Sequence, residues 1–317
     1  MKLFKKLASI ITLIVCFLVL AAAILFLHSD IPLDELKARY AEPPSTFLSV
    51  NGMNVHYRDQ GHNSTTPPIV LLHGTGASLH TFEGWTKRLH DEYRVITLDL
   101  PGYGLTGPFP DRDYSIENYV SFLNDFFNEL GVNEFILGGN SLGGHIAWRY
   151  TVKYTDQVGG LILINSAGYP YKSESKPAAF HLAETPVIKH LFKYITPRFV
   201  VEQSVENIYS NRELVTDSLV DRYFELSLRP GNRQAFIDRM EIETSPTAYL
   251  QIQTIQQPTL ILWGEDDRLI PLEIAYRFHE ELPDSRLVMI PETGHIPMEE
   301  SPERSLSYVL SFLADLY

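Results

Sequence analysis

Residues 134–148 read EFILGGNSLGGHIAW and carry the clearest fold signal in the chain. The apolar run at 134–138 suits a buried strand, and the residues that follow GNSLG at 139–143 suit a helix. A G-x-S-x-G sequence at a strand-to-helix turn raises its serine hydroxyl above the sheet, and its glycines leave room for the tight backbone. We therefore predict that Ser141 is a nucleophile, rather than a serine in an ordinary helix N-cap turn.

Short apolar runs and helical stretches alternate along most of the chain. Runs rich in Ile, Val and Leu suit strands that are buried on both faces of a parallel sheet, and Asn51-Gly52 between the first two runs indicates a hairpin. The alternation predicts an α/β fold, a mostly parallel sheet with helices on both faces. The expected strands are residues 47–50, 53–58, 69–73, 94–98, 134–138, 161–165, 259–264 and 286–290, and the expected helices include 116–130, 143–153, 272–281 and 302–316.

One interval breaks this alternation. Between the expected strands at 161–165 and 259–264 there is no convincing strand pattern, and prolines interrupt the helix-compatible segments. A structureless loop of this length is implausible in a compact domain. We therefore predict that residues 169–248 form a helical cap over the carboxyl edge of the sheet, while 46–168 and 249–317 form the core.

The N-terminal residues have the pattern of a signal anchor. Residues 1–6 form a basic n-region with three lysines, and the 21 residues 7–27 carry no charge. A helix of that length spans about 31 Å, enough to cross a hydrocarbon core of about 30 Å. The basic flank predicts a single-pass protein with a cytoplasmic N-terminus, a juxtamembrane connector at 28–45 and an extracytoplasmic domain. The alternative is a signal peptide cleaved near Ala21-Ala22-Ala23, which would release a secreted protein.

Composition excludes several other classes of protein. The 317 residues include 26 Lys+Arg and 39 Asp+Glu, a formal charge of −13, with 44% hydrophobic and 21% charged residues. These are ordinary globular proportions, and an acidic chain repels nucleic-acid phosphates, so we expect no nucleic-acid partner. The single cysteine, Cys16, excludes a disulfide framework or a cysteine-based zinc site within one chain.

A serine nucleophile needs a base and an acid that orients it. His295 follows the expected strand at 286–290, which places its imidazole at the carboxyl edge of the sheet, and its near-neutral pKa suits proton transfer. The acid is sought in WGEDDRLIP at 263–271, which leaves a strand for a loop. Asp267 is the candidate, with Asp266 as the alternative, and the order Ser, acid, His agrees with a hydrolase triad.

The oxyanion of the reaction needs hydrogen-bond donors. The sequence HGTG at 73–76 ends an expected strand, and its glycines permit a turn that exposes backbone N–H groups. The N–H groups of Thr75 and Leu142 are therefore the candidates for an oxyanion hole, with His73 as a structural turn residue.

Five ordered motifs resemble those of the α/β-hydrolase superfamily, in its branch of small hydrolases with a helical cap. They are HGTG at 73–76, DLPGYG at 99–104, GNSLG at 139–143, GEDDRLIP at 264–271, and Gly294-His295 with Glu300 and Pro302. This resemblance covers about residues 47–316 apart from the cap, and it implies an eight-stranded sheet whose second strand is antiparallel. It also implies hydrolysis without a metal or an organic cofactor.

The family contains several chemistries. Its epoxide hydrolases and haloalkane dehalogenases use an aspartate nucleophile, which Ser141 argues against. Its carbon–carbon hydrolases of meta-cleavage products share the G-N-S-x-G-G elbow, but they usually carry HG-x-GPG where this chain has HGTGAS, and often Trp where it has Ile296. We therefore expect a membrane-anchored esterase or lipase-like enzyme that acts through an acyl-enzyme on small-molecule or lipid-derived esters. The alternatives are carbon–carbon hydrolysis, perhydrolysis by the same triad, or a binding protein that has lost catalysis.

Overall fold

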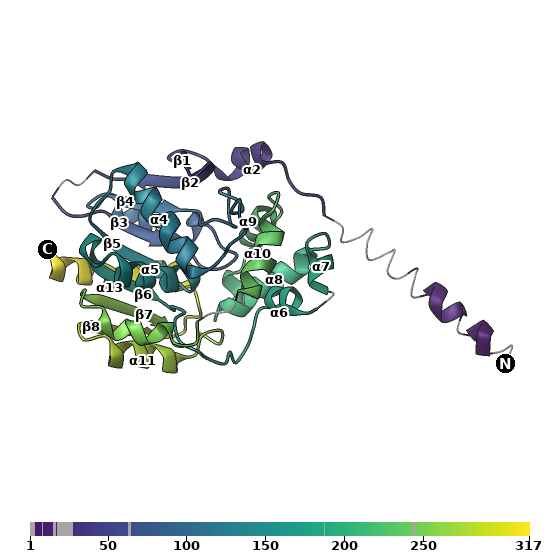
Figure 1. Ribbon diagram of the computed structural model, residues 1–317. Coiled ribbons are helices and arrows are strands. Elements are labelled where there is room, and N and C mark those ends of the chain that lie inside the picture. Colours follow the sequence, from purple (N-terminus) through teal and green to yellow (C-terminus); the bar gives the residue numbers. More distant parts are fainter. Residues whose placement is uncertain are drawn as a thin grey trace.

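An eight-stranded mixed sheet forms the centre of the molecule (Figure 1). The computed structural model describes residues 4–7, 9–14, 17, 28–62, 65–186, 188–242 and 245–317, without the side chain of Phe192. The strand order is β1-β2-β4-β3-β5-β6-β7-β8. The strands are β1 (Thr46–Val50), β2 (Met53–Gln60), β3 (Ile69–Leu72), β4 (Val95–Leu98), β5 (Phe135–Asn140), β6 (Val158–Ile164), β7 (Thr259–Gly264) and β8 (Ser285–Ile290).

Strand β2 is antiparallel to both of its neighbours, whereas β3 to β8 pair in parallel. This arrangement confirms the sheet that the family resemblance implies. The expected strand at 161–165 begins three residues earlier, at Val158. Gly159 and Gly160 weaken the apolar pattern there, but Val158 and Gly160 pair with β5. The central strands are buried on both faces, which explains why their sequences are continuous apolar runs.

Helices cover both faces of the sheet. One hydrophobic cluster joins the sheet to α4 (Ile116–Leu130), α5 (Leu142–Lys153) and α11 (Leu272–Glu281), and a second joins it to α3 (Glu83–Leu89) and α13 (Pro302–Leu316). Neighbouring residues of β5 show the alternation, since Leu137 belongs to the first cluster and Ile136 to the second. Among the expected helices, α4, α11 and α13 have the expected bounds and α5 begins one residue earlier.

In the described residues between β6 and β7, five α-helices form a helical cap at one end of the sheet (Figure 1). They are α6 (Ala178–Glu184), α7 (Ile188–Phe192), α8 (Arg198–Ile208), α9 (Asp217–Ser227) and α10 (Asn232–Glu241). A short helix, α12 (Pro297–Glu300), follows β8 and reaches the cap through its glutamates, as described below.

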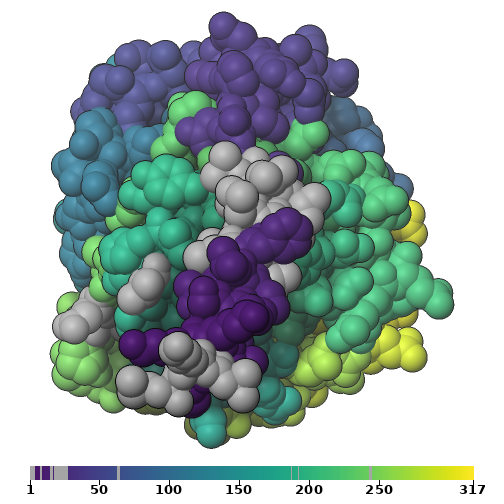
Figure 2. Space-filling model, turned by 90° about the vertical axis from the view of Figure 1, so that its right-hand side faces the viewer, coloured from purple at the N-terminus to yellow at the C-terminus, as the bar shows by residue number. Residues whose placement is uncertain are grey.

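The connector after residue 27 packs against the cap and the core. The backbone N–H of Ile31 donates to Leu228 O at 2.9 Å, and Arg233 pairs with Asp30 at 2.7 Å. In helix α2 (Leu33–Tyr40), Leu36 is fully buried. Figure 2 shows this purple segment along the rim of the green and teal cap.

The predicted membrane helix, residues 7–27, lies mostly outside the described residues. Within the part of the chain that is described, no helix combines the length and the apolar character needed to cross a membrane.

Candidate active site

Ser141 occupies a sharp turn between β5 and α5. Its φ is +53°, a left-handed value that is uncommon for residues other than glycine and often marks a functional turn. The backbone N–H of Ser141 donates to Ile164 O at 3.0 Å, which fixes the turn to the neighbouring strand. A Cβ on Gly139 would overlap the backbone of Gly143, and a Cβ on Gly143 would overlap the Leu72 carbonyl. The glycines therefore permit the close backbone contacts that this turn requires.

His295 lies in the loop after β8 and lines the same cavity as Ser141. Its Nδ1 is 2.7 Å from Oδ2 of Asp267, and both side chains are buried. Asn140 Nδ2 donates to the His295 carbonyl at 3.0 Å, so the residue before the serine also holds the histidine backbone. Because Nδ1 donates to the carboxylate, Nε2 is the ring nitrogen that remains to accept a proton.

The structure places Asp267 beside the histidine and turns Asp266 elsewhere. Oδ1 of Asp267 accepts from the backbone N–H groups of Leu269 and Ile270 at 2.8 and 3.0 Å, and Oδ2 also accepts from Asn165 Nδ2 at 2.7 Å. Asp266 is exposed and accepts from Ser210 Oγ at 2.5 Å. The loop backbone therefore presents the second of the two aspartates to the imidazole.

The loop after β3 lies against the serine. A Cβ on Gly74 would be only 2.8 Å from Asn140 Oδ1 and 3.2 Å from Ser141 Cβ. Thr75, the next residue, lines the cavity with Ser141. Leu142 is the first residue of α5, so its N–H has no carbonyl one turn earlier in the helix to bind. The proposed oxyanion donor of Leu142 therefore follows the serine directly at the positive end of α5, and Thr75 lies on the wall of the same cavity.

His73 fixes this loop. Its Nε2 accepts from the backbone N–H of Leu100 at 2.9 Å, so its Nδ1 carries the hydrogen and donates to Gly74 O at 2.8 Å. Burial lowers the pKa of His73, which keeps the ring neutral. These contacts match the structural role predicted for this histidine.

A buried carboxylate, Asp99, organises the loop after β4. Its oxygens accept from the backbone N–H groups of Leu79 and Leu105 at 2.8 and 2.7 Å and from His56 Nδ1 at 2.7 Å. Burial opposes ionisation, but His56 and the nearby histidines outweigh it and hold the pKa of Asp99 well below its usual range. The loop that Asp99 fixes carries Tyr103 into the wall of the cavity beside Ser141. The motif at 99–104 marked this loop, but the sequence did not reveal the partner, which lies 43 residues earlier.

A second carboxylate, Glu300, joins the histidine loop to the cap. Its two oxygens accept from the backbone N–H groups of Gly294 at 2.6 Å and Asn211 at 2.7 Å. The N–H of His295 donates directly to the carbonyl of Ile208 at 2.8 Å. The neighbouring Glu299 adds hydrogen bonds to two side chains of α9, Arg222 and Tyr223, at 2.9 and 3.0 Å. The cap is thus bonded to the segment that holds the base.

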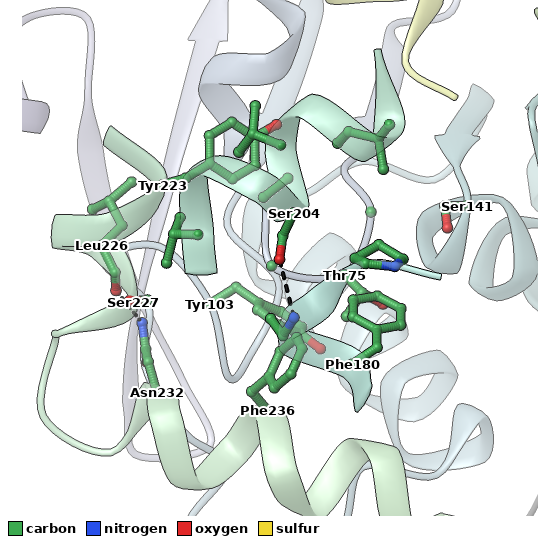
Figure 3. A pocket seen from close by; sticks show the side chains of 18 of the residues that line it. Thr75, Tyr103, Ser141, Phe180, Ser204, Tyr223, Leu226, Ser227, Asn232 and Phe236 are labelled. Carbon is green, nitrogen blue, oxygen red and sulfur yellow. Dashed lines mark hydrogen bonds between the residues drawn. The ribbon is translucent and has the colours of Figure 1, made fainter. Parts of the chain in front are cut away.

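Two cavities meet at Ser141. The first, here called the apolar cavity, encloses about 1020 Å³ with the space open to solvent, and His295 and Thr75 line it beside Ser141. Figure 3 shows Ser141 at one side of this cavity and Tyr223 and Leu226 at the other. Its apolar walls include Phe180, Val201, Val205, Ile208, Leu226, Phe236, Leu269 and Ile296.

The second, here called the polar cavity, encloses about 1460 Å³ by the same measure, and Leu142, His145, Arg149 and Arg239 line it beside Ser141. The two cavities share Thr75, Ser141, Phe180 and Leu269.

The aromatic side chains of the cap segment occupy different places. Phe180 lines both cavities, and Tyr169 and Tyr171 line the polar cavity. Tyr194 and Phe199 have exposed fractions of 55% and 48% and line neither. The side chain of Phe192 lies outside the described residues. Aliphatic side chains of α8 and α9 therefore form a large part of the wall of the apolar cavity.

Within the described residues, no group of three or more His, Cys, Asp or Glu side chains is arranged to hold a metal ion.

Comparisons with known proteins agree on the fold. The sequence model of the alpha/beta hydrolase fold matches residues 67–302. A 2-hydroxy-6-oxo-6-(2'-aminophenyl)hexa-2,4-dienoic acid hydrolase of Metapseudomonas resinovorans is 27% identical over 276 residues, covering 84% of this chain and 90% of that protein. A thermophilic esterase of Thermogutta terrifontis is similar in structure, with a TM-score of 0.70 and 27% identity over 86% of this chain and 97% of that one. The meta-cleavage product hydrolase CumD of Pseudomonas fluorescens IP01 has a TM-score of 0.74 at 23% identity, covering 86% of this chain and 98% of that one.

Proposed function

Because this chain belongs to the alpha/beta hydrolase fold family, we propose that it is a serine hydrolase that cleaves carboxylic esters through Ser141, His295 and Asp267. The observation that carries the proposal is the apolar cavity that begins at the serine and histidine and extends under the cap. Such a cavity suits the acyl chain of an ester, because burial of each methylene contributes about 0.8 kcal/mol of binding free energy.

In the proposed reaction Ser141 Oγ attacks the ester carbonyl while His295 Nε2 takes its proton. The negative oxygen of the tetrahedral intermediate is held by the N–H groups of Thr75 and Leu142, each of which contributes about 3 kcal/mol to transition-state stabilisation. The histidine returns the proton to the departing alkoxide, which leaves an acyl-enzyme on Ser141. Water, activated by the same histidine, then releases the carboxylic acid.

Asp267 keeps the hydrogen of His295 on Nδ1 and stabilises the imidazolium that forms. The three other donors on its carboxylate, Asn165 and the backbone of Leu269 and Ile270, fix its orientation.

Carbon–carbon hydrolysis of a meta-cleavage product is the second candidate. It is supported by the 27% identity to a dienoic acid hydrolase over 84% of this chain and by the GNSLGG elbow. Two differences argue against it. The loop after β3 reads HGTGAS where those hydrolases usually carry HG-x-GPG, and Ile296 stands where they often have Trp. Ile296 is buried and adds to the apolar cavity. We therefore place ester cleavage first.

The test compares p-nitrophenyl esters of increasing acyl length with a 2-hydroxy-6-oxo-dienoate, using the full-length chain purified in detergent. We expect ester hydrolysis that depends on acyl length, that S141A abolishes, and that accompanies labelling of Ser141 by a fluorophosphonate. Turnover of the dienoate without turnover of any ester would favour the second candidate. A folded protein that neither reacts with the fluorophosphonate nor hydrolyses either substrate would instead be a binding protein.

We also propose that residues 7–27 anchor the enzyme in a membrane, with the N-terminus in the cytoplasm and the hydrolase domain outside it. The proposal is supported by the three lysines that precede the uncharged run. The described chain resumes against the cap, where the N–H of His28 donates to Tyr194 O at 3.3 Å. Ile188 and Leu191 of α7, which are near Tyr194 in the sequence, have exposed fractions of 42% and 54%. Exposed apolar side chains of this kind suit contact with lipid.

Carbonate extraction of membranes from expressing cells tests the anchor. An integral protein with an intact N-terminus is expected in the pellet. A soluble protein whose N-terminus begins near Ala23 would show that the segment is a cleaved signal peptide.

A further inference from the structure

The polar cavity has one more cation than it has carboxylates. Among the described residues, five charged side chains line it: Glu117, Arg149, Lys176, Glu184 and Arg239. Arg149 Nη2 donates to Glu117 Oε1 at 2.6 Å, and Lys176 Nζ donates to the two Glu184 oxygens at 2.7 and 2.8 Å. These two pairs balance, so the excess positive charge belongs to Arg239.

The acids near Arg239 in the sequence bind other cations. Asp238 accepts two hydrogen bonds from Arg112, at 2.7 and 2.8 Å, and Glu241 pairs with Lys189. The Nε of Arg239 is buried and has no hydrogen-bond partner anywhere in the described part of the chain. A buried donor of this kind is costly to leave without an acceptor. A ligand that brings oxygen acceptors to this point would therefore gain binding free energy.

Helix α10 carries Arg239 into the wall of the polar cavity, which Ser141 also lines. Phe236 lies three residues earlier on the same side of the helix and lines the apolar cavity, where its ring centroid is 5.5 Å from that of Phe180 (Figure 3). Arg239 lines the polar cavity, which shares Ser141 and Thr75 with the apolar one. One helix thus presents an aromatic ring on one side of the serine and a guanidinium on the other.

The neighbouring titratable groups add no second charge to the polar cavity. Burial, followed by the charges of Arg239 and Arg149, lowers the pKa of His145 to about 3, so its ring is neutral at physiological pH. Burial raises the pKa of Tyr171 to about 12 and also raises the pKa of Tyr169, which keeps both phenols protonated. An anion in this cavity would therefore meet one unbalanced cation.

We propose that Arg239 binds an anionic group, a carboxylate or a phosphate, on the alcohol side of an ester whose acyl chain occupies the apolar cavity. This inference rests on the proposed ester hydrolysis at Ser141. With the scissile carbonyl held between Ser141 and the N–H of Thr75, the apolar and anionic ends of one substrate would each enter the cavity of matching character. The guanidinium fork suits both ligands, because it can donate two parallel hydrogen bonds to the oxygens of either. The substrate class is therefore an acylated hydroxy acid or an acylated phosphoalcohol.

The test uses three esters with the same butyryl group, made with 4-hydroxybenzoate, 4-hydroxybenzamide and 4-hydroxyphenyl phosphate. The carboxamide copies the shape of the carboxylate without its charge. We expect kcat/KM of the wild-type, full-length enzyme to be about tenfold to a hundredfold higher for the carboxylate than for the carboxamide, the range typical of hydrogen bonds to charged groups. R239Q should remove this preference, so that kcat/KM for the carboxylate ester falls about tenfold to a hundredfold relative to kcat/KM for the carboxamide ester, while R239K should keep part of the preference.

R112Q is the matched control, because Arg112 is an exposed cation that lies outside both cavities and binds Asp238, the residue before Arg239. It should keep the full preference for the carboxylate ester. Inhibition of p-nitrophenyl butyrate hydrolysis by benzoate, with benzamide for comparison, gives a second readout that needs no variant. Wild-type enzyme should bind benzoate more tightly than benzamide.

The outcomes separate this inference from the proposed function. If the enzyme hydrolyses p-nitrophenyl butyrate but treats the carboxylate, phosphate and carboxamide esters alike, the role of Arg239 is refuted and ester hydrolysis stands. Equal losses on both esters in folded R239Q would also refute it. If no ester is hydrolysed, the proposed function itself fails. A preference confined to the phosphate ester would identify phosphate as the ligand, and a preference shared by both anions would identify negative charge.

Discussion

Replacing Asp267 with asparagine tests the assignment of the acid most sharply. Oδ1 of Asp267 accepts from two backbone N–H groups, whereas Oδ2 accepts from Asn165 Nδ2 and from His295 Nδ1, both at 2.7 Å. In D267N the amide oxygen is expected to stay with the backbone donors, so the amide NH2 replaces Oδ2 and faces two further donors. His295 must then hold its hydrogen on Nε2 in order to accept at Nδ1. That tautomer cannot take the proton of Ser141.

The expected loss in kcat is about 10⁴-fold, the effect of a wrong histidine tautomer in a serine triad, or about 5.5 kcal/mol of activation free energy. The cost in unfolding free energy should be smaller, about 1.5–3 kcal/mol, because one charge-assisted hydrogen bond is lost and the backbone bonds remain. Initial rates of p-nitrophenyl butyrate hydrolysis measure the first quantity, and urea unfolding followed by circular dichroism measures the second.

D266N is the control, since Asp266 is exposed and binds Ser210 of the cap rather than the histidine. Its kcat should stay close to that of the wild type. The reasoning is wrong if D267N keeps more than about a tenth of the wild-type kcat, far above the residual activity expected of a triad without its acid. It is also wrong if D266N loses as much as D267N.

Three further substitutions test the surroundings of the site. E300Q should lower the unfolding free energy in urea by about 1.5–3 kcal/mol, because one of the two backbone N–H partners of Glu300 loses its acceptor. It should also lower kcat, since Gly294 adjoins the base. An unchanged kcat would show that the histidine loop keeps its position without the carboxylate. The low folded pKa of Asp99 means that its carboxylate stabilises the fold above the unfolded value of about 3.9 and loses this contribution as the pH falls toward the folded pKa. The unfolding free energy of the wild type should therefore fall as the pH drops below about 5. D99N should have an unfolding free energy about 3–5 kcal/mol lower at pH 7, and urea titrations should show that it depends less on pH. G143A should prevent folding or lower the unfolding free energy by more than about 4 kcal/mol, because the added Cβ would overlap the Leu72 carbonyl. A thermal melt like that of the wild type would contradict the packing described for the turn.

The sequence was sufficient for the sheet because buried parallel strands leave continuous apolar runs, such as those of β3, β4 and β7. Helix α4 was also well bounded, since Ser115 caps its first turn and Gly131, with φ +69°, ends it. The cap was predicted only as a helical insertion. Its helices are short and partly buried, and their packing depends on contacts that no local pattern records.

In the candidate site, too, some features follow from local sequence and others depend on tertiary contacts. The position of Ser141 follows from the local rule for a strand-to-helix turn. The choice between Asp266 and Asp267 depended on how the loop backbone orients two adjacent side chains, which only the structure shows. Asn211, one partner of Glu300, and His56, one partner of Asp99, lie 89 and 43 residues away from these acids, so these two hydrogen bonds have no signature in a single sequence.

The bond between His295 N–H and the Ile208 carbonyl has a consequence for protein engineering. Because Gly294 packs against the backbone of Ile208, with Glu300 bridging to Asn211, the cap and the histidine loop share an interface made largely of main-chain atoms. A cap transplanted from another hydrolase must reproduce a carbonyl and an N–H at these points, whatever its side chains. Chimaeras designed to alter substrate range therefore do better to keep residues 208–211 of the recipient and exchange only the helices before and after them.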